Sequence, residues 1–94
     1  MDYKELQHQL NYKFKNIELL ELALTHKSYS NSNNNERLEY LGDSILNSAI
    51  SQYLFKRFTN EKEGLLTRMR AYLVKAETLI IKAEEFALGD YIKL

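Results

Sequence analysis

Three carboxylates that lie close together in the chain, Glu36, Glu39 and Asp43, are the side chains best placed to do chemistry. On a helix their spacings of three and four put them on one face, within about 60° of one another. A hard divalent cation such as Mg²⁺ would relieve their mutual repulsion, because it takes carboxylates, waters and substrate phosphates as ligands. An ordinary solvated acidic face is the alternative that spacing alone leaves open. Asp43 is the best single candidate. The helix dipole stabilises acids in the first turn, but Asp43 lies beyond that turn, so the dipole does not explain it.

Composition limits the classes of protein that need to be considered. The 94 residues suit one domain, and the absence of cysteine excludes disulfides and thiolate metal sites. Thirteen basic and thirteen acidic residues cancel, so nucleic-acid binding would depend on local patches or on metal ions. No apolar run is longer than four residues and the first residues do not resemble a signal peptide. We therefore expect no membrane association and a cytoplasmic location.

The elements that must position the acids are expected to be helices. Proline is absent and glycine occurs three times, which favours an all-α fold over a turn-rich sheet. Asn16 predicts an N-cap, Asn60 with Glu63 a capping box, and Gly89 a left-handed helix stop. Apolar spacing predicts helices over residues 2–10, 17–24, 36–58, 65–74 and 76–87.

The helix expected over 36–58 is the longest and carries an apolar stripe of Leu38, Leu41, Ile45 and Ala49. Further along, Leu46, Ile50, Tyr53 and Leu54 add apolar character on the other flank, and a helix that ends apolar nearly all round is predicted to be central to the fold. Gly42 costs helix stability, so a close approach by another helix is the expected reason for it, with simple tolerance as the alternative. The apolar residues at 91–94 have nothing after them to pack on, which predicts a domain truncated before its last helices.

Residues 35–46 (NERLEYLGDSIL) resemble the signature helix of ribonuclease III, the endonuclease of double-stranded RNA. Residues 23–29, 63–71 and 86–89 resemble other segments of that family in the same order, so the resemblance spans nearly the whole chain. It implies the helical ribonuclease III endonuclease-domain fold, with residues 1–94 as the N-terminal part of the catalytic domain. It also implies a homodimeric enzyme that uses Mg²⁺, with Mn²⁺ as a substitute, to hydrolyse phosphodiesters in double-stranded RNA.

The resemblance assigns roles to several residues of the chain. Glu39 and Asp43 match metal-binding catalytic carboxylates, while Glu36 and Glu63 match further acidic positions of the catalytic valley. Tyr40 falls where the family has an aromatic residue that docks into the partner subunit, and we place Leu41 and Gly42 in the same dimer interface. A second acidic pair and a double-stranded-RNA-binding domain, both found in the family, have no counterpart in these 94 residues. The chain is therefore expected to carry half of the metal ligands.

Basic side chains are the expected RNA contacts, because duplex RNA is recognised mainly through phosphates and 2′-hydroxyls. Ordinary solvated charge is the alternative for each of them, and Arg37 could instead pair with an acid. His26 is expected to be a hydrogen-bonded structural residue, and no histidine is assigned as a general base. The candidate RNA-binding residues are Lys27, Arg37, Arg68 and Arg70.

Two hypotheses about function follow. In the first, the chain is part of an Mg²⁺-dependent ribonuclease III that acts in the processing of rRNA and other RNA. In the second, it is a non-catalytic helical module of the same fold that dimerises or binds RNA. Either way we expect self-association, because apolar faces around Ile80, Phe86 and Tyr91 would otherwise stay exposed.

Overall fold

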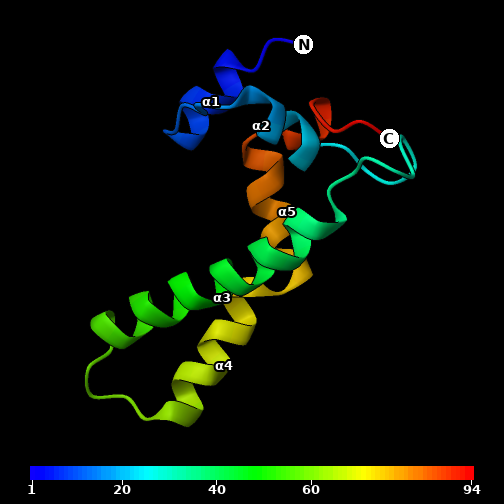
Figure 1. Cartoon of the computed structure of the whole chain (residues 1–94). Helices are drawn as coiled ribbons and strands as arrows, with labels where there is room; N and C mark the ends of the chain where they lie inside the picture. The colour runs from blue at the N-terminus through cyan, green and yellow to red at the C-terminus, as the bar shows by residue number, and fades with distance from the viewer.

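The structure, a computed structural model, describes all 94 residues and is entirely helical, which confirms the expected fold class (Figure 1). The only β-type feature is an isolated parallel bridge between Thr25 and Lys93. None of the helices has the length and apolar character needed to cross a membrane. The elements in chain order are α1 (Lys4–Leu10), α2 (Ile17–Ala23), α3 (Glu36–Arg57), α4 (Glu63–Val74), α5 (Ala76–Glu85) and the short 3-10 helix η1 (Leu88–Asp90).

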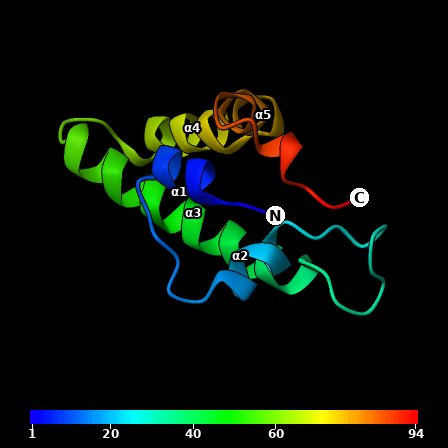
Figure 2. The same cartoon turned by 90° about the horizontal axis from the view of Figure 1, so that it is seen from above.

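The helices form a small packed end and a projecting hairpin. α3 runs away from α1 and α2, and α4 returns beside it (Figure 1). α5 then leads the chain back, so that η1 and the last residues lie near α1 and α2. Both chain ends therefore lie on the same side of the molecule (Figure 2).

Three local expectations about helix ends can be compared with the structure. Asn16 caps α2 as predicted, because its side-chain oxygen accepts the Glu18 N–H at 3.1 Å. The capping box was wrong: α4 begins at Glu63 itself, two residues earlier than expected, and Asn60 lies in the preceding turn. The left-handed residue after α5 is Ala87, with φ of 52°, and Gly89 lies inside η1.

The hydrophobic core lies at the packed end of the molecule. Six of the 94 residues are buried, and four of them form one cluster that joins α1 to α2. Side chains from the C-terminal segment pack against this cluster, which explains why the two ends of the chain meet. The buried members are Tyr3, Leu6, Leu20 and Leu24, and the partly buried residues around them are Phe14, Phe86, Leu88 and Tyr91.

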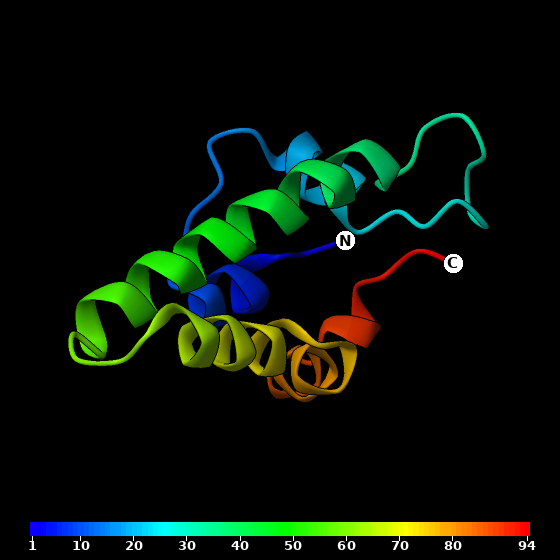
Figure 3. The ribbon, with the colours of Figure 1, turned by 90° about the horizontal axis from the view of Figure 1, so that it is seen from below.

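Hydrogen bonds attach the start of α3 to this packed end. The Asn35 backbone N–H donates to the Thr25 carbonyl, and the Asn35 side-chain amide donates to the Ala23 carbonyl, both at 2.9 Å. On the other side, the His26 N–H donates to the Lys93 carbonyl at 2.9 Å. The segment after α2 is thus held between the beginning of α3 and the C-terminal residues (Figure 3).

The long helix is less enclosed than its sequence predicted. Leu54 is its only buried residue, and Leu41 and Ile45 are 55% and 59% exposed, so the prediction of a central helix was wrong for the isolated chain. α4 is only 12 residues long against 22 for α3, and it packs along the later part of α3. No atom lies within 4 Å of where a Cβ on Gly42 would be, so no helix of the same chain approaches there.

Candidate active site

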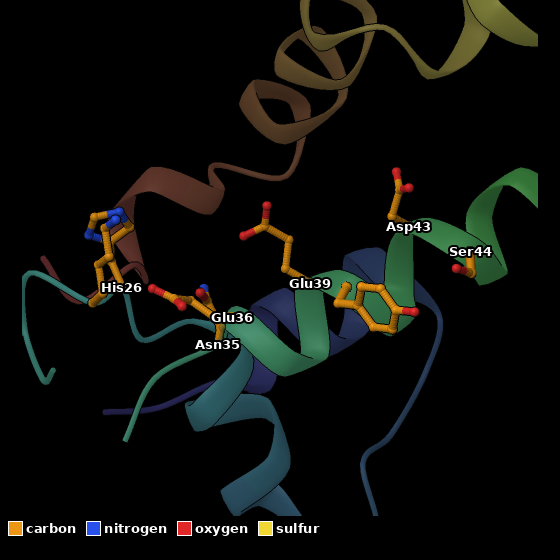
Figure 4. A pocket seen from close by; sticks show the side chains of 8 residues that line it. His26, Asn35, Glu36, Glu39, Asp43 and Ser44 are labelled. Atoms are coloured by element: carbon orange, nitrogen blue, oxygen red, sulfur yellow. The ribbon is translucent and has the colours of Figure 1, made fainter. Parts of the chain in front are cut away.

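An open groove of about 660 Å³ lies along the first turns of α3 (Figure 4). It contains all three acids of the sequence cluster together with Lys27, one of the four candidate RNA-binding residues. One wall is the first two turns of α3, and the other comes from the segment that follows α2. The residues that line it are His26, Lys27, Asn35, Glu36, Glu39, Tyr40, Asp43 and Ser44.

The carboxylates of Glu39 and Asp43 point away from α3 on the same side (Figure 4). This follows from their spacing of four residues, which stacks side chains one turn apart. Glu36 lies one turn earlier and points toward His26. All three acids are exposed and none forms an ion pair, since the only ion pair of the chain joins Lys82 to Glu85. The groove therefore has uncompensated negative charge.

Asparagines before α3 hold the acids at the groove. The Asn34 side-chain oxygen accepts the Glu36 N–H at 3.1 Å and so satisfies a free donor of the first helical turn. Asn35 is bonded to Ala23 and Thr25, as described above. These bonds anchor the first turn of α3. They therefore fix the direction of the helix and turn its acidic face toward the groove.

The donor chemistry of the groove suits an oxygen-seeking cation. Two carboxylates one turn apart, with open space for waters and a phosphate, match what Mg²⁺ accepts from proteins. The chain holds no group of three or more His, Asp or Glu side chains that could coordinate a metal together. Glu39 and Asp43 thus fit as two of the oxygen ligands of such a cation, and these side chains alone do not complete its coordination.

Glu63 is not brought to this groove. It begins α4 and lines a separate hollow with Phe55 and Phe58, near the far end of α3. Asp43 and Arg57 are fourteen residues apart on α3, which corresponds to about 20 Å along the helix axis. Within one chain, Glu63 therefore cannot act on a group held by Glu39 and Asp43.

The four candidate RNA-binding residues have different surroundings. Lys27 lines the groove, and Arg37 lines an adjoining hollow of about 990 Å³ beside the loop of residues 31–34. Arg37 forms no ion pair, so the alternative of pairing with an acid is not observed. Arg68 is exposed on α4. Arg70 is half-buried and its Nη1 donates to Ser51 Oγ at 2.8 Å, which links α4 to α3, so its role in RNA binding stays a prediction.

The structure adds four residues to the groove that the sequence did not assign to it, namely His26, Asn35, Ser44 and Tyr40, the last of which was expected at the dimer interface. Ser44 could have been found, since it directly follows Asp43 and lies eight residues, or about two turns, after Glu36. His26 and Asn35 could not, because their positions depend on hydrogen bonds between residues distant in the chain. His26 is hydrogen-bonded as expected, with Nδ1 2.9 Å from Ser28 Oγ, but its ring also lies on the groove.

The residues expected at a dimer interface are uncovered in the single chain. The Tyr40 side chain is 80% exposed, Leu41 is largely exposed, and the surface around Gly42 is open. An aromatic ring and a leucine left in water on one helix face are typical of a surface that another molecule covers. Their role in dimerisation stays a prediction.

Comparison with known proteins gives consistent matches over this chain. Residues 16–94 match a family model described as Ribonuclease-III-like. The chain is 56% identical over 92 residues to Ribonuclease 3 of Marinomonas sp. strain MWYL1, covering 98% of the chain and 40% of that protein. It is 53% identical over 94 residues to Ribonuclease 3 of Glaesserella parasuis serovar 5, covering the whole chain and 42% of that protein. The chain thus spans about two fifths of the length of these curated relatives.

Solved structures agree with this result. The chain superposes on the nuclease domain of ribonuclease III from Campylobacter jejuni with a TM-score of 0.95 and 43% identity, covering 99% of this chain and 65% of that one. A second structure of the same nuclease domain matches with a TM-score of 0.93. Sequence and fold agree over nearly every residue, and the chain therefore belongs to the ribonuclease III family.

Proposed function

We propose that this chain provides one wall of the active site of a ribonuclease III, an endonuclease that hydrolyses phosphodiesters in double-stranded RNA. The observation that carries the proposal is the pair of exposed, unpaired carboxylates, Glu39 and Asp43, that point into the same groove. Family membership supports the reaction class, since the relatives are called Ribonuclease 3. The proposal includes a part in processing rRNA and other RNA, which rests on the sequence resemblance, and a cytoplasmic location, which rests on the composition of the chain.

The groove is proposed to bind Mg²⁺, or Mn²⁺ in its place, through Glu39 and Asp43. When bound, such a cation supplies Lewis acidity for phosphodiester hydrolysis. Glu36 adds negative charge one turn earlier, at the end of the groove nearest His26. The chain's own contribution is therefore to hold two oxygen ligands at a fixed spacing and to keep the groove open to water and substrate.

RNA contact is proposed for Lys27, Arg37 and Arg68. Lys27 lies in the groove itself, and Arg37 lies on the adjoining face of α3, where neither is engaged in an ion pair. Cationic side chains near an acidic groove let the phosphate backbone approach, since electrostatic contact to phosphates dominates nucleic-acid affinity. Arg70 is set apart from these three because one nitrogen of its guanidinium already donates to Ser51.

A homodimer built on the first half of α3 completes the proposal. The chain exposes 7780 Å², whereas a compact protein of its mass exposes about 5,700 Å². If two chains each buried this excess of roughly 2,000 Å², the interface would bury about 4,000 Å² in total, which is within the range of obligate dimers. A structure of the C. jejuni nuclease domain is described as having a flexible region involved in dimer formation. Tyr40, Leu41 and Gly42 are proposed to lie in the interface, together with the exposed Ile45.

The alternative function is a non-catalytic module that binds RNA or dimerises. One observation favours it for the isolated chain, namely that no three potential ligands converge on one point. The two functions differ in whether RNA binding needs a cation at Glu39 and Asp43. They can therefore be separated by a binding measurement that does not depend on cleavage.

The test is binding of a fluorescein-labelled RNA duplex by the full chain, followed by fluorescence anisotropy in Mg²⁺ and in EDTA. We expect tighter binding in Mg²⁺ because a cation held by Glu39 and Asp43 would offset their negative charge and attract the phosphates of the duplex. Glu39→Gln and Asp43→Asn should each remove this Mg²⁺ dependence, whereas Glu77→Gln, which changes an exposed acid in the first turn of α5, should retain it. Equal affinity in Mg²⁺ and EDTA for the unaltered chain would instead support the non-catalytic module.

A further inference from the structure

His26 lies at the mouth of the groove with its two ring nitrogens in different environments. Nδ1 lies 3.1 Å from the backbone nitrogen of Ser28 and 2.9 Å from Ser28 Oγ. A backbone N–H can only donate, so Nδ1 accepts this bond and the proton of the neutral ring is on Nε2. The turn at residues 26–28 thus sets the tautomer and leaves an N–H donor at Nε2.

The position of the ring is fixed by the backbone around it. The His26 N–H donates to the Lys93 carbonyl at 2.9 Å, and the His26 carbonyl accepts the Tyr29 N–H at 3.0 Å. Across the groove, the two bonds from Asn35 hold the first turn of α3 against residues 23–25. As a result, His26 and Glu36 face each other across one end of the groove (Figure 4).

The Nε2–H of His26 donates no hydrogen bond within the chain. His26 forms no ion pair, and the only side-chain hydrogen bonds of its ring are the Nδ1 contacts to Ser28. The Glu36 side chain points toward His26 but forms no ion pair with it. In a groove lined by three carboxylates, an unused donor at the rim is suited to an oxygen of an incoming ligand.

We propose that His26 is an RNA-binding residue whose Nε2–H donates to a phosphate oxygen of the bound strand. The inference rests on the proposed function and adds a contact at the Glu36 end of the groove. Glu36 and Asp43 are seven residues apart, or about 10 Å along α3. The phosphate held by His26 would thus lie in the same groove as the one at Glu39 and Asp43, toward its Glu36 end. His26 orients the strand and transfers no proton.

Two substitutions of His26 separate the functions of its two ring nitrogens. In His26→Asn the side-chain oxygen replaces Nδ1 as the acceptor from Ser28, but the donor toward the groove is lost. In His26→Gln the amide nitrogen reaches the position of Nε2, but the Nδ1 acceptor is lost. The inference predicts that His26→Asn weakens RNA-duplex binding about tenfold in Mg²⁺, as expected for a hydrogen bond to a charged group, while His26→Gln binds nearly as the unaltered chain does.

Thermal unfolding shows whether a His26 substitution acts only by destabilising the fold, and not by removing a contact to RNA. His26→Gln should lower the Tm by several degrees because the turn at Ser28 loses its acceptor, whereas His26→Asn should not. His8→Asn is the matched control, since His8 is the only other histidine and lines a separate hollow beside α1. Long-range ¹H–¹⁵N spectra of the free chain should show His26 with its proton on Nε2, and RNA should shift that signal.

Unchanged RNA affinity in His26→Asn would overturn the inference, as would loss of affinity in His26→Gln that parallels a loss of Tm. Either result leaves the proposed function intact, provided that the unaltered chain binds RNA and that Asp43→Asn removes the Mg²⁺ dependence. If the unaltered chain fails to bind the duplex in Mg²⁺, both the proposed function and this inference are wrong.

Discussion

At the scale of single residues, the direction in which α3 points its side chains decides which acids can act together. Glu39 and Asp43 are one turn apart and share the groove, whereas Glu63 has the same charge but lies beyond the far end of the helix. The spacing of Glu39 and Asp43 is a local property, because backbone hydrogen bonds within one helix fix it. The separation of Glu63 from them depends on where α4 begins.

A cation titration tests this difference. Mn²⁺ binding, followed by paramagnetic broadening of amide NMR signals, should broaden residues 39–43 first and be competed by Mg²⁺. Asp43→Asn should weaken binding at least about tenfold, because loss of even an outer-sphere partner of a metal costs 10- to 100-fold. Glu63→Gln should bind as the unaltered chain does. An equal loss in Glu63→Gln would mean that a second copy supplies this carboxylate.

At the scale of elements, the α3–α4 hairpin is held by few interactions. Leu54 is the only buried side chain of α3, α4 has none, and Arg70 provides the one side-chain hydrogen bond between the two helices. This hairpin projects from the core at the opposite end of the molecule (Figure 1). Its stability in the isolated chain should therefore be sensitive to that single bond.

Arg70→Met keeps much of the aliphatic length of the side chain and removes the donor to Ser51. We expect the free energy of unfolding to fall by about 1 kcal/mol, the usual net value of one hydrogen bond. Urea denaturation followed by circular dichroism measures it. Arg68→Met, on the exposed face of the same helix, should change stability by less than about 0.5 kcal/mol. Equal effects of the two substitutions would contradict a structural role specific to Arg70.

At the scale of the whole molecule, the chain is extended for its length. Its radius of gyration is 15.5 Å, against about 13 Å for a compact domain of 100 residues. The cause is that the core occupies only the end formed by α1, α2 and the C-terminal segment, while the first half of α3 is uncovered. A surface of this kind favours association.

Sedimentation velocity tests the association that this surface predicts. The unaltered chain should sediment as a dimer at micromolar concentrations, and Tyr40→Ser or Ile45→Glu should shift it toward monomer because each removes apolar area from the proposed interface. Tyr12→Ser, which changes an exposed tyrosine in the α1–α2 connection, should leave the dimer unchanged. A monomer at high concentration for the unaltered chain would contradict the proposal.

The sequence predicted the features that depend on neighbouring residues. Five helices, the Asn16 cap and the shared face of Glu36, Glu39 and Asp43 all follow from periodicity and local hydrogen bonding, and the structure agrees. The errors at residues 60–63 and 87–89 also concern neighbouring residues, where a turn or a left-handed residue shifts a helix end by two positions. The predicted burial of α3 failed for another reason: an apolar stripe shows that a surface is covered, but not whether the same chain covers it.

By itself, the sequence determined the helical class, the acidic face of α3 and the family to which the chain belongs. Only the tertiary structure decided which residues face those acids. His26, Lys27 and Asn35 reach the groove through hydrogen bonds from Asn35 to residues 23 and 25 and from His26 to Lys93. The spacing of side chains on a helix is the same in every turn, so it can be predicted from neighbouring residues in the sequence. Contacts between residues far apart in the chain form only when the core brings the two ends together.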